Sequence, residues 1–239
     1  KINNSNVTYS LSKNIASGFV EYTSAGDTDS PHTYTLGQNG NVTELQSGAP
    51  RTLSSPPTLV NGAIYTIYWQ GTDAAGNIGN VGSTNVTFDT TAPSLDTVTI
   101  ASNNNVNTDK AKENDVITLT IVANETITTP TVSFSIDGTE VTSSASVSGS
   151  GSNYTATYTV LSGQNGSVTF SISSYSDSAG NAGPTVTALT SGSTVSVDNT
   201  LPNFSPSQPA FSDMKINTST LKYPLSEDLS SGSITYTRT

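Results

Sequence analysis

The chain has no cysteine and a single histidine among its 239 residues. The first absence excludes disulfide bonds and thiolate metal ligands. The second leaves His32 as the one imidazole for hydrolytic catalysis, and we interpret it as a surface loop residue in Ser30-Pro31-His32-Thr33. No long inserted loop is available to build a carboxylate-lined cleft for sugar hydrolysis, and no glycine-rich phosphate loop occurs. We therefore expect a protein that is not an enzyme.

Basic residues are also scarce, because 8 Lys and Arg stand against 18 Asp and Glu and give a net charge of −10. This balance argues against partners such as nucleic acid or an anionic membrane surface, and it favours cations. No apolar run reaches the roughly 18 residues of a transmembrane helix. We expect no membrane span within this sequence.

Hydrophobic residues make up 33% of the chain and charged residues 11%, a mixture that can indicate disorder. Here the apolar residues follow a period of two, since they alternate with polar residues in 7–11, 117–123 and 221–225. Such alternation is typical of half-buried strands, and no segment shows a helical period. Pro and Gly recur at short intervals between the alternating segments. The sequence therefore predicts an all-β fold.

Two features of the pattern concern turns and register. Asn39-Gly40 and Asn165-Gly166 predict hairpin turns. The apolar residues of 65–69 and 168–172 differ by one residue in their distance from the Asp that follows, which predicts a β-bulge in one of the two segments. The expected strands lie near 6–12, 18–24, 32–36, 63–72, 83–89, 96–101, 115–123, 131–137, 153–160, 167–175, 186–198, 219–226 and 232–238.

The chain repeats itself. Asp73-Ala74-Ala75-Gly76-Asn77 recurs as Asp177-Ser178-Ala179-Gly180-Asn181, and the segment 88–93 recurs as 197–202. The pattern of residues 1–23 reappears from Lys215 to Thr237. Self-similarity of this kind indicates an array of like units.

The repeats divide the chain into units of about 100 residues, the size of one β-sandwich. We expect one unit over 1–92 that lacks its first strand, a complete unit over 93–202, and the N-terminal part of a third over 203–239. The linkers Asp89–Pro93 and Asp198–Pro202 are short and contain Pro, so the junctions should be semi-rigid. The prediction is a set of tandem Greek-key sandwiches that form an extended rod.

Oxygen-rich residues recur at fixed places in these units. Calcium takes carboxylate, amide and backbone oxygens, and the Gly of each repeated loop lets the backbone fold back toward an ion. Asp and Asn before Gly are equally well explained as turn residues, so both interpretations stay open. Asp115 begins a strand and could complete a site with the preceding linker. Glu125 is a further candidate partner, but Lys13 stands at the aligned position of the first unit and weakens that interpretation. The candidate calcium ligands are Asp73, Asn77, Asp89, Asp115, Asp177, Asn181 and Asp198.

The loop 73–77 followed by Phe88-Asp89-Thr90-Thr91-Ala92-Pro93 resembles bacterial immunoglobulin-like repeats, and residues 98–105 and 114–120 are similar to the opening strands of that family. The family occurs in large secreted surface proteins and giant adhesins. The resemblance implies an immunoglobulin-like fold, a location outside the cell or on its surface, and interdomain aspartates that bind Ca²⁺. The linker of the second unit departs from the pattern at Asn199 and Leu201.

Three functions follow as hypotheses. The first is a non-catalytic spacer that holds an adhesive tip, of unknown surface ligand, away from the cell, with neighbouring repeats of the same chain as partners. The second is a subunit of an extracellular filament or sheath, in which a strand from another copy completes an open sandwich. The third is a glycan- or surface-binding module, whose stacking groups would be Tyr22, Tyr34, Tyr68 or Trp69.

Overall fold

The computed structural model describes residues 1–141, 145–203, 224–229, 231–233 and 235. Within them, regular structure consists of β-strands and two short 3-10 helices, η1 (Gln38–Gly40) and η2 (Val42–Leu45). The strands expected near 219–226 and 232–238 fall mainly outside the described residues. The all-β prediction is confirmed.

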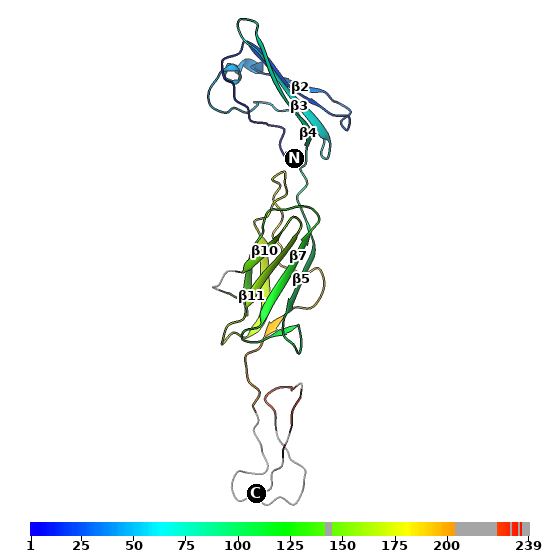
Figure 1. The fold of residues 1–239 in the computed structure, drawn as a ribbon, viewed down its shortest axis with the longest axis vertical. Helices are drawn as coiled ribbons and strands as arrows, with labels where there is room; N and C mark the ends of the chain where they lie inside the picture. Colours follow the sequence, from blue (N-terminus) through cyan, green and yellow to red (C-terminus); the bar gives the residue numbers. More distant parts are fainter. Residues whose placement is uncertain (142–144, 204–223, 230, 234, 236–239) are drawn as a thin grey trace, which may run out of the picture.

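One antiparallel sheet forms the N-terminal part of the molecule (Figure 1). Its strand order is β2-β1-β3-β4. One face of this sheet carries the first core, a cluster of buried side chains that also draws on the irregular segments between the strands. The strands are β1 (Ser17–Thr23), β2 (His32–Thr35), β3 (Ile64–Thr72) and β4 (Ile78–Thr87).

Two sheets follow, with strand orders β10-β11-β7-β5 and β6-β13-β12-β8-β9. All their strand pairs are antiparallel except β13 with β6. The strands of the first are β5 (Leu95–Ser102), β7 (Val116–Ala123), β10 (Ser146–Ser150) and β11 (Asn153–Thr159). Those of the second are β6 (Lys110–Ala111), β8 (Thr131–Ile136), β9 (Thr139–Glu140), β12 (Gly166–Ser173) and β13 (Ser196–Val197).

Side chains from both of these sheets form the second core. Strand β7 shows the reason, because its burial alternates along its length and Ile117, Leu119 and Ile121 are each 0% exposed. Strand β8 supplies Phe134 from the other sheet, with its ring 6.1 Å from that of Tyr158. A core shared by two antiparallel sheets is consistent with a β-sandwich.

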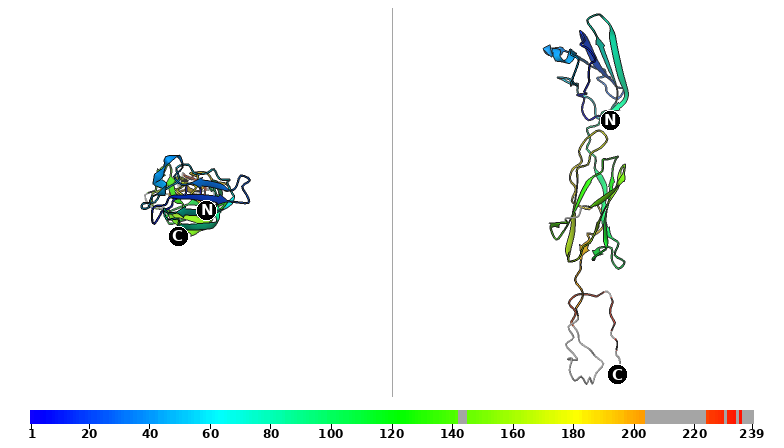
Figure 2. Two further views of the ribbon diagram at one scale, coloured as in Figure 1. Left: turned by 90° about the horizontal axis from the view of Figure 1, so that it is seen from above. Right: turned by 60° about the vertical axis from the view of Figure 1, so that its left-hand side comes forward.

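The two cores occupy successive positions along the long axis of the molecule, and both views of the ribbon agree on this (Figures 1 and 2). The chain passes from one to the other through the residues between β4 and β5. The predicted semi-rigid linker Asp89–Pro93 lies at this junction.

Several sequence-based expectations were wrong in detail. The segment 6–12 forms no strand and makes an isolated bridge, Tyr9 to Arg51. Of the residues expected to form a strand over 186–198, the structure assigns Ser196–Val197 (β13) to a strand and the others to irregular segments. Neither Asn-Gly pair makes a hairpin: Asn39 lies in η1, and Asn165 joins β11 in one sheet to β12 in the other.

The one-residue difference between the repeated segments has a local cause. Ser174 follows β12 directly and has a φ of 56°, so the chain takes an extra residue in the left-handed region before it reaches Asp177. The buried faces Tyr65–Ile67 and Val168–Ile172 can therefore both point inward. A separate register shift occurs between β3 and β4 near Tyr65, where Asn85 has a φ of 58°.

We predict that the two cores unfold separately. Phe134→Ala removes a ring that is 1% exposed in the second core and should lower its free energy of unfolding by about 3–5 kcal/mol. Trp69, the single tryptophan, belongs to the first core and reports on it alone. In urea, the circular dichroism transition should move to lower concentration while the Trp69 fluorescence transition stays in place. Equal shifts of both signals would contradict the prediction.

Candidate metal centre at the junction

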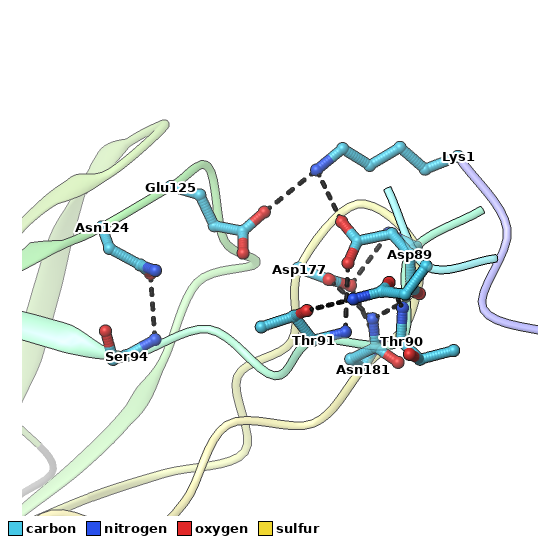
Figure 3. A network of polar contacts seen from close by, with 11 residues as sticks. Lys1, Asp89, Thr90, Thr91, Ser94, Asn124, Glu125, Asp177 and Asn181 are labelled. Carbon is cyan, nitrogen blue, oxygen red and sulfur yellow. Dashed lines mark hydrogen bonds and ion pairs between the residues drawn. The ribbon is translucent and has the colours of Figure 1, made fainter. Parts of the chain in front are cut away.

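Three carboxylates converge where the two parts of the molecule meet (Figure 3). Asp89 follows β4, Glu125 follows β7, and Asp177 lies in the loop after β12. One oxygen from each lies within 4.8 Å of the others. The junction thus gathers negative charge from three separate segments.

The loop around Asp177 is held by the carboxylate itself. Its Oδ1 accepts hydrogen bonds from the backbone N–H groups of Ala179 at 2.9 Å and Asn181 at 2.8 Å. Its Oδ2 accepts one from Asn181 Nδ2 at 2.8 Å. Gly180 takes a φ of 94°, which favours glycine at the turn. The acid therefore acts as the organising group of a tight turn.

The repeated loop around Asp73 has the same geometry. Ala75 N, Asn77 N and Asn77 Nδ2 each lie 2.9 Å from an Asp73 carboxylate oxygen. Here the ammonium group of Lys13 also contacts Oδ2 of Asp73. Lys13 aligns with Glu125, so the first copy of the loop has an internal cation where the second has another carboxylate.

Polar contacts cross the junction between the two parts. Lys1 Nζ lies 2.9 Å from Asp89 Oδ2 and 3.1 Å from Glu125 Oε2. Asn181 Nδ2 also donates to the backbone oxygen of Asp89 at 2.8 Å. Exposed ion pairs of this kind contribute about 0–1 kcal/mol each, so these contacts orient the junction more than they stabilise it.

The surroundings favour the ionised form of Asp89 and Asp177. The ammonium group of Lys1, together with the N–H of Thr91, holds the pKa of Asp89 below its usual value of 3.8, although the charge of Asp177 opposes this. Burial raises the pKa of Asp177, but hydrogen bonds from Asn181 and Ala179 outweigh it and the pKa is lowered. The two carboxylates thus carry their charges at neutral pH, and among the described residues Lys1 supplies the ammonium group that contacts Asp89.

The three carboxylates supply part of the oxygen ligand set that a hard cation such as Ca²⁺ requires. Each carboxylate offers two oxygens, and Ca²⁺ takes six to eight oxygen ligands from such groups, backbone carbonyls and water. Asp89, Glu125 and Asp177 are the residues that could hold it. An ion placed among them would take over the contacts that Lys1 now makes. Glu125 is not among the seven predicted ligands, because the lysine at the aligned position, Lys13, argued against a ligand there.

The remaining predicted ligands lie elsewhere. Asp115 accepts hydrogen bonds from Asn104 Nδ2 at 2.7 Å and the N–H of Lys112 at 2.9 Å, and the structure does not bring it to Asp89. Asp198 accepts the N–H of Thr200 at 3.0 Å, as Asp89 accepts that of Thr91 at 3.1 Å. Asp73 and Asn77 lie in the first copy of the loop, where Lys13 contacts Asp73.

A second polar cluster corrects the interpretation of His32. This residue begins β2, its side chain is 20% exposed, and its Nε2 lies 2.6 Å from Oδ2 of the buried Asp27. Tyr65 donates to the same oxygen at 2.5 Å. The backbone N–H of Asp29 donates to Oδ1 of Asp27 at 3.0 Å. The cluster closes the β1–β2 connection and stabilises the fold.

Two of the four aromatic residues proposed for sugar stacking are buried, while Tyr68 and Trp69 are partly buried. Tyr22 is 0% exposed and Tyr34 is 3% exposed, so neither can stack on a ligand. Tyr34 instead donates to Glu44, a buried acid that sequence reasoning missed. Both Glu44 oxygens are used, since Ser54 N and Gly37 N donate to them at 2.8 Å each. Its role is structural.

Comparisons with known proteins identify no family for this chain. No protein-family model matches the chain, and no curated protein sequence matches it. Among the described residues, no helix is long and apolar enough to cross a membrane.

Acid should weaken the first core through Asp27. Hydrogen bonds from Tyr65 and His32 lower the pKa of Asp27 from its usual 3.8, so its stabilising effect is present above that value and is lost as the pH falls below it. We predict that Asp27→Asn lowers stability at about pH 7 and makes little difference at about pH 2.5. Urea unfolding followed by Trp69 fluorescence measures the stability of Asp27→Asn and of the parent chain at each pH.

The exposed neighbour Asp29 offers the control. Asp29→Asn removes the same charge without touching Tyr65 or His32, so its stability should match that of the parent at both values of pH. A constant difference between Asp27→Asn and the parent chain across this range would contradict the assigned role of Asp27.

Proposed function

We propose that the chain is a stretch of immunoglobulin-like spacer repeats from a bacterial extracellular surface protein or adhesin, without catalytic activity, whose junction is stiffened by Ca²⁺. The observation that carries the proposal is the use of one loop in two settings. Asp73 is neutralised within its own part of the molecule by Lys13, whereas Asp177 lies beside Glu125 of the same part and Asp89 of the linker. A catalytic site is normally built once, whereas a joint is built wherever units meet.

The junction supports a role for a cation through its charge balance. Three carboxylates lie within 4.8 Å of one another, and Lys1 is the ammonium group that contacts two of them. Since side chains from the linker, the β7 end and the β12 loop all contribute, an ion bound there would tie the linker to the second core. Asn181 already makes part of this connection through the backbone oxygen of Asp89.

Calcium should raise the thermal stability of the junction. A ligand that binds the folded state alone shifts the melting temperature with its concentration. We predict that millimolar Ca²⁺ raises the melting temperature of the 239-residue chain and that a chelator reverses the rise. Glu125→Gln should reduce or abolish the calcium response, because it removes the charge of a carboxylate at the centre of the cluster.

Glu140→Gln is the matched control. Glu140 is exposed in β9 and is not part of the cluster, so this substitution removes the same charge at another place. Its calcium response should equal that of the parent chain. If the parent shows no response to Ca²⁺, or if Glu140→Gln loses it as completely as Glu125→Gln, the calcium part of the proposal is wrong and the loops are plain turns.

The spacer role requires an extended particle in solution. A compact domain of 239 residues would have a radius of gyration of about 18 Å. We predict a clearly larger value by small-angle X-ray scattering, and a narrower distribution of interatomic distances with Ca²⁺ than with chelator. A radius near the compact value in both conditions would exclude a stiff spacer.

A further inference from the structure

Asparagine side chains hold the linker between the two parts of the molecule, and two of them come from the second part (Figure 3). Asn181 Nδ2 donates to the backbone oxygen of Asp89 at 2.8 Å. Asn124 Oδ1 accepts the N–H of Ser94 at 2.9 Å, and the N–H of Asn124 donates to the backbone oxygen of Ser94 at 3.0 Å. The second part therefore contacts the connection at residue 89 and again at residue 94.

A third asparagine comes from the first part and lies just before β3. Asn61 Oδ1 accepts the N–H of Thr90 at 2.8 Å, and Asn61 Nδ2 donates to Thr91 Oγ1 at 2.9 Å. The next residue, Gly62, donates its N–H to the backbone oxygen of Phe88 at 2.7 Å. Through its side chain, Asn61 thus extends the pairing between the ends of β3 and β4 into the linker.

The contacts from the two parts overlap along the linker. The second part holds residue 89, the first part holds residues 90 and 91, and the second part holds residue 94. Pro93 is buried, and its ring fixes its φ. Among the residues that the structure describes, Ala92 is left with neither kind of restraint. Rotation of the backbone over 89–91 would therefore break a contact to one part or to the other.

The contact made by Asn61 recurs at the second linker. Asn165 also precedes a glycine, and it follows Asn61 by 104 residues, the same spacing as between the two acidic loops. Its Oδ1 accepts the N–H of Asn199 at 2.7 Å. Asn199 is the residue after the linker aspartate, as Thr90 is in the first linker. An asparagine that holds this position of the linker is thus a repeated feature of the chain.

We propose that Asn61, Asn124 and Asn181 form a binding site for the extended linker backbone, and that this site sets the orientation of the second part relative to the first without a bound ion. Amide side chains suit the task, because each has donors and an acceptor and carries no charge. Asn61 and Asn124 are exposed, so each hydrogen bond contributes little to the stability of either core. They are positioning residues, and the proposal goes beyond the calcium role because the site operates in chelator.

Spin labels measure the orientation directly. The chain has no cysteine, so Thr23→Cys and Ser150→Cys together provide one exposed labelling position in each part. Pulsed electron paramagnetic resonance on the labelled 239-residue chain in chelator should give a narrow distribution of distances. Asn61→Ala should broaden it roughly twofold, because a linker without this restraint samples more backbone conformations.

Asn39→Ala is the matched control. Asn39 also precedes a glycine and is exposed in the first part, but it lies in η1 and takes no part in the linker contacts described above. The distribution for this variant should have the width of the parent distribution. Broadening by Asn39→Ala as large as that by Asn61→Ala would contradict the proposal.

The outcomes separate this site from the proposed calcium role. A parent distribution that is broad in chelator and narrows with Ca²⁺ would overturn the amide site and support the calcium role. A narrow distribution in chelator that Asn61→Ala leaves unchanged would overturn the amide site as well. A narrow distribution that broadens in Asn61→Ala and does not respond to Ca²⁺ would support the amide site and contradict the calcium role.

Amide hydrogen exchange in chelator tests the contact itself. Asn61→Ala should speed the exchange of the Thr90 N–H about fivefold, whereas the N–H of Ser94, which donates to Asn124, should keep its rate. Equal Thr90 rates in the variant and the parent would contradict the assignment. Urea unfolding followed by Trp69 fluorescence should give the same transition for both chains.

Asn124→Ala decides the question from the second part if Asn61→Ala destabilises the first core. This substitution removes the acceptor of the Ser94 N–H and lies outside the first core. It should broaden the distance distribution in chelator while the Trp69 unfolding transition stays in place. A width equal to that of the parent would overturn the proposal.

Discussion

A carboxylate that accepts three hydrogen bonds from its own loop is the interaction on which the junction depends. Asp177 receives two backbone N–H groups and the Asn181 amide, and this fixes the loop before any contact with the linker is made. The Tyr175 ring packs over Gly183, where a Cβ would lie 2.0 Å from it, and so fixes the way the chain leaves the loop. A rigid acidic loop can then be used wherever a unit ends.

The charge of this loop has to be balanced by its surroundings, and the two copies do so differently. Lys13 contacts Asp73 from the same part of the molecule. At the junction the aligned position is Glu125, so the charge accumulates and Lys1 contacts two of the three acids. One difference within the repeat, Lys13 at the position of Glu125, thus separates a loop whose carboxylate is paired by a lysine of its own part from one whose carboxylate lies beside two further carboxylates.

The sequence predicted side-chain burial better than it predicted pairing. The alternation over 115–123 and 131–137 matched β7 and β8, because each has hydrogen-bonded neighbours on both sides. The two-residue strand β6 carries no periodic signal, and it forms through its parallel contact with β13. Repeats located the acidic loops, yet they could not show that Asp177 meets Asp89 while Asp115 does not, since that depends on which end of a sheet each residue reaches.

The segment 6–12 shows where a periodic pattern stops being sufficient. Period two reports that alternate side chains face a core, and half-buried Val7, Tyr9 and Leu11 do so. A regular strand also requires partners for its backbone groups, and Tyr9 finds one on a single side, at Arg51. The pattern therefore records which side chains are buried, and the backbone pairing decides that the segment makes an isolated bridge and no regular strand.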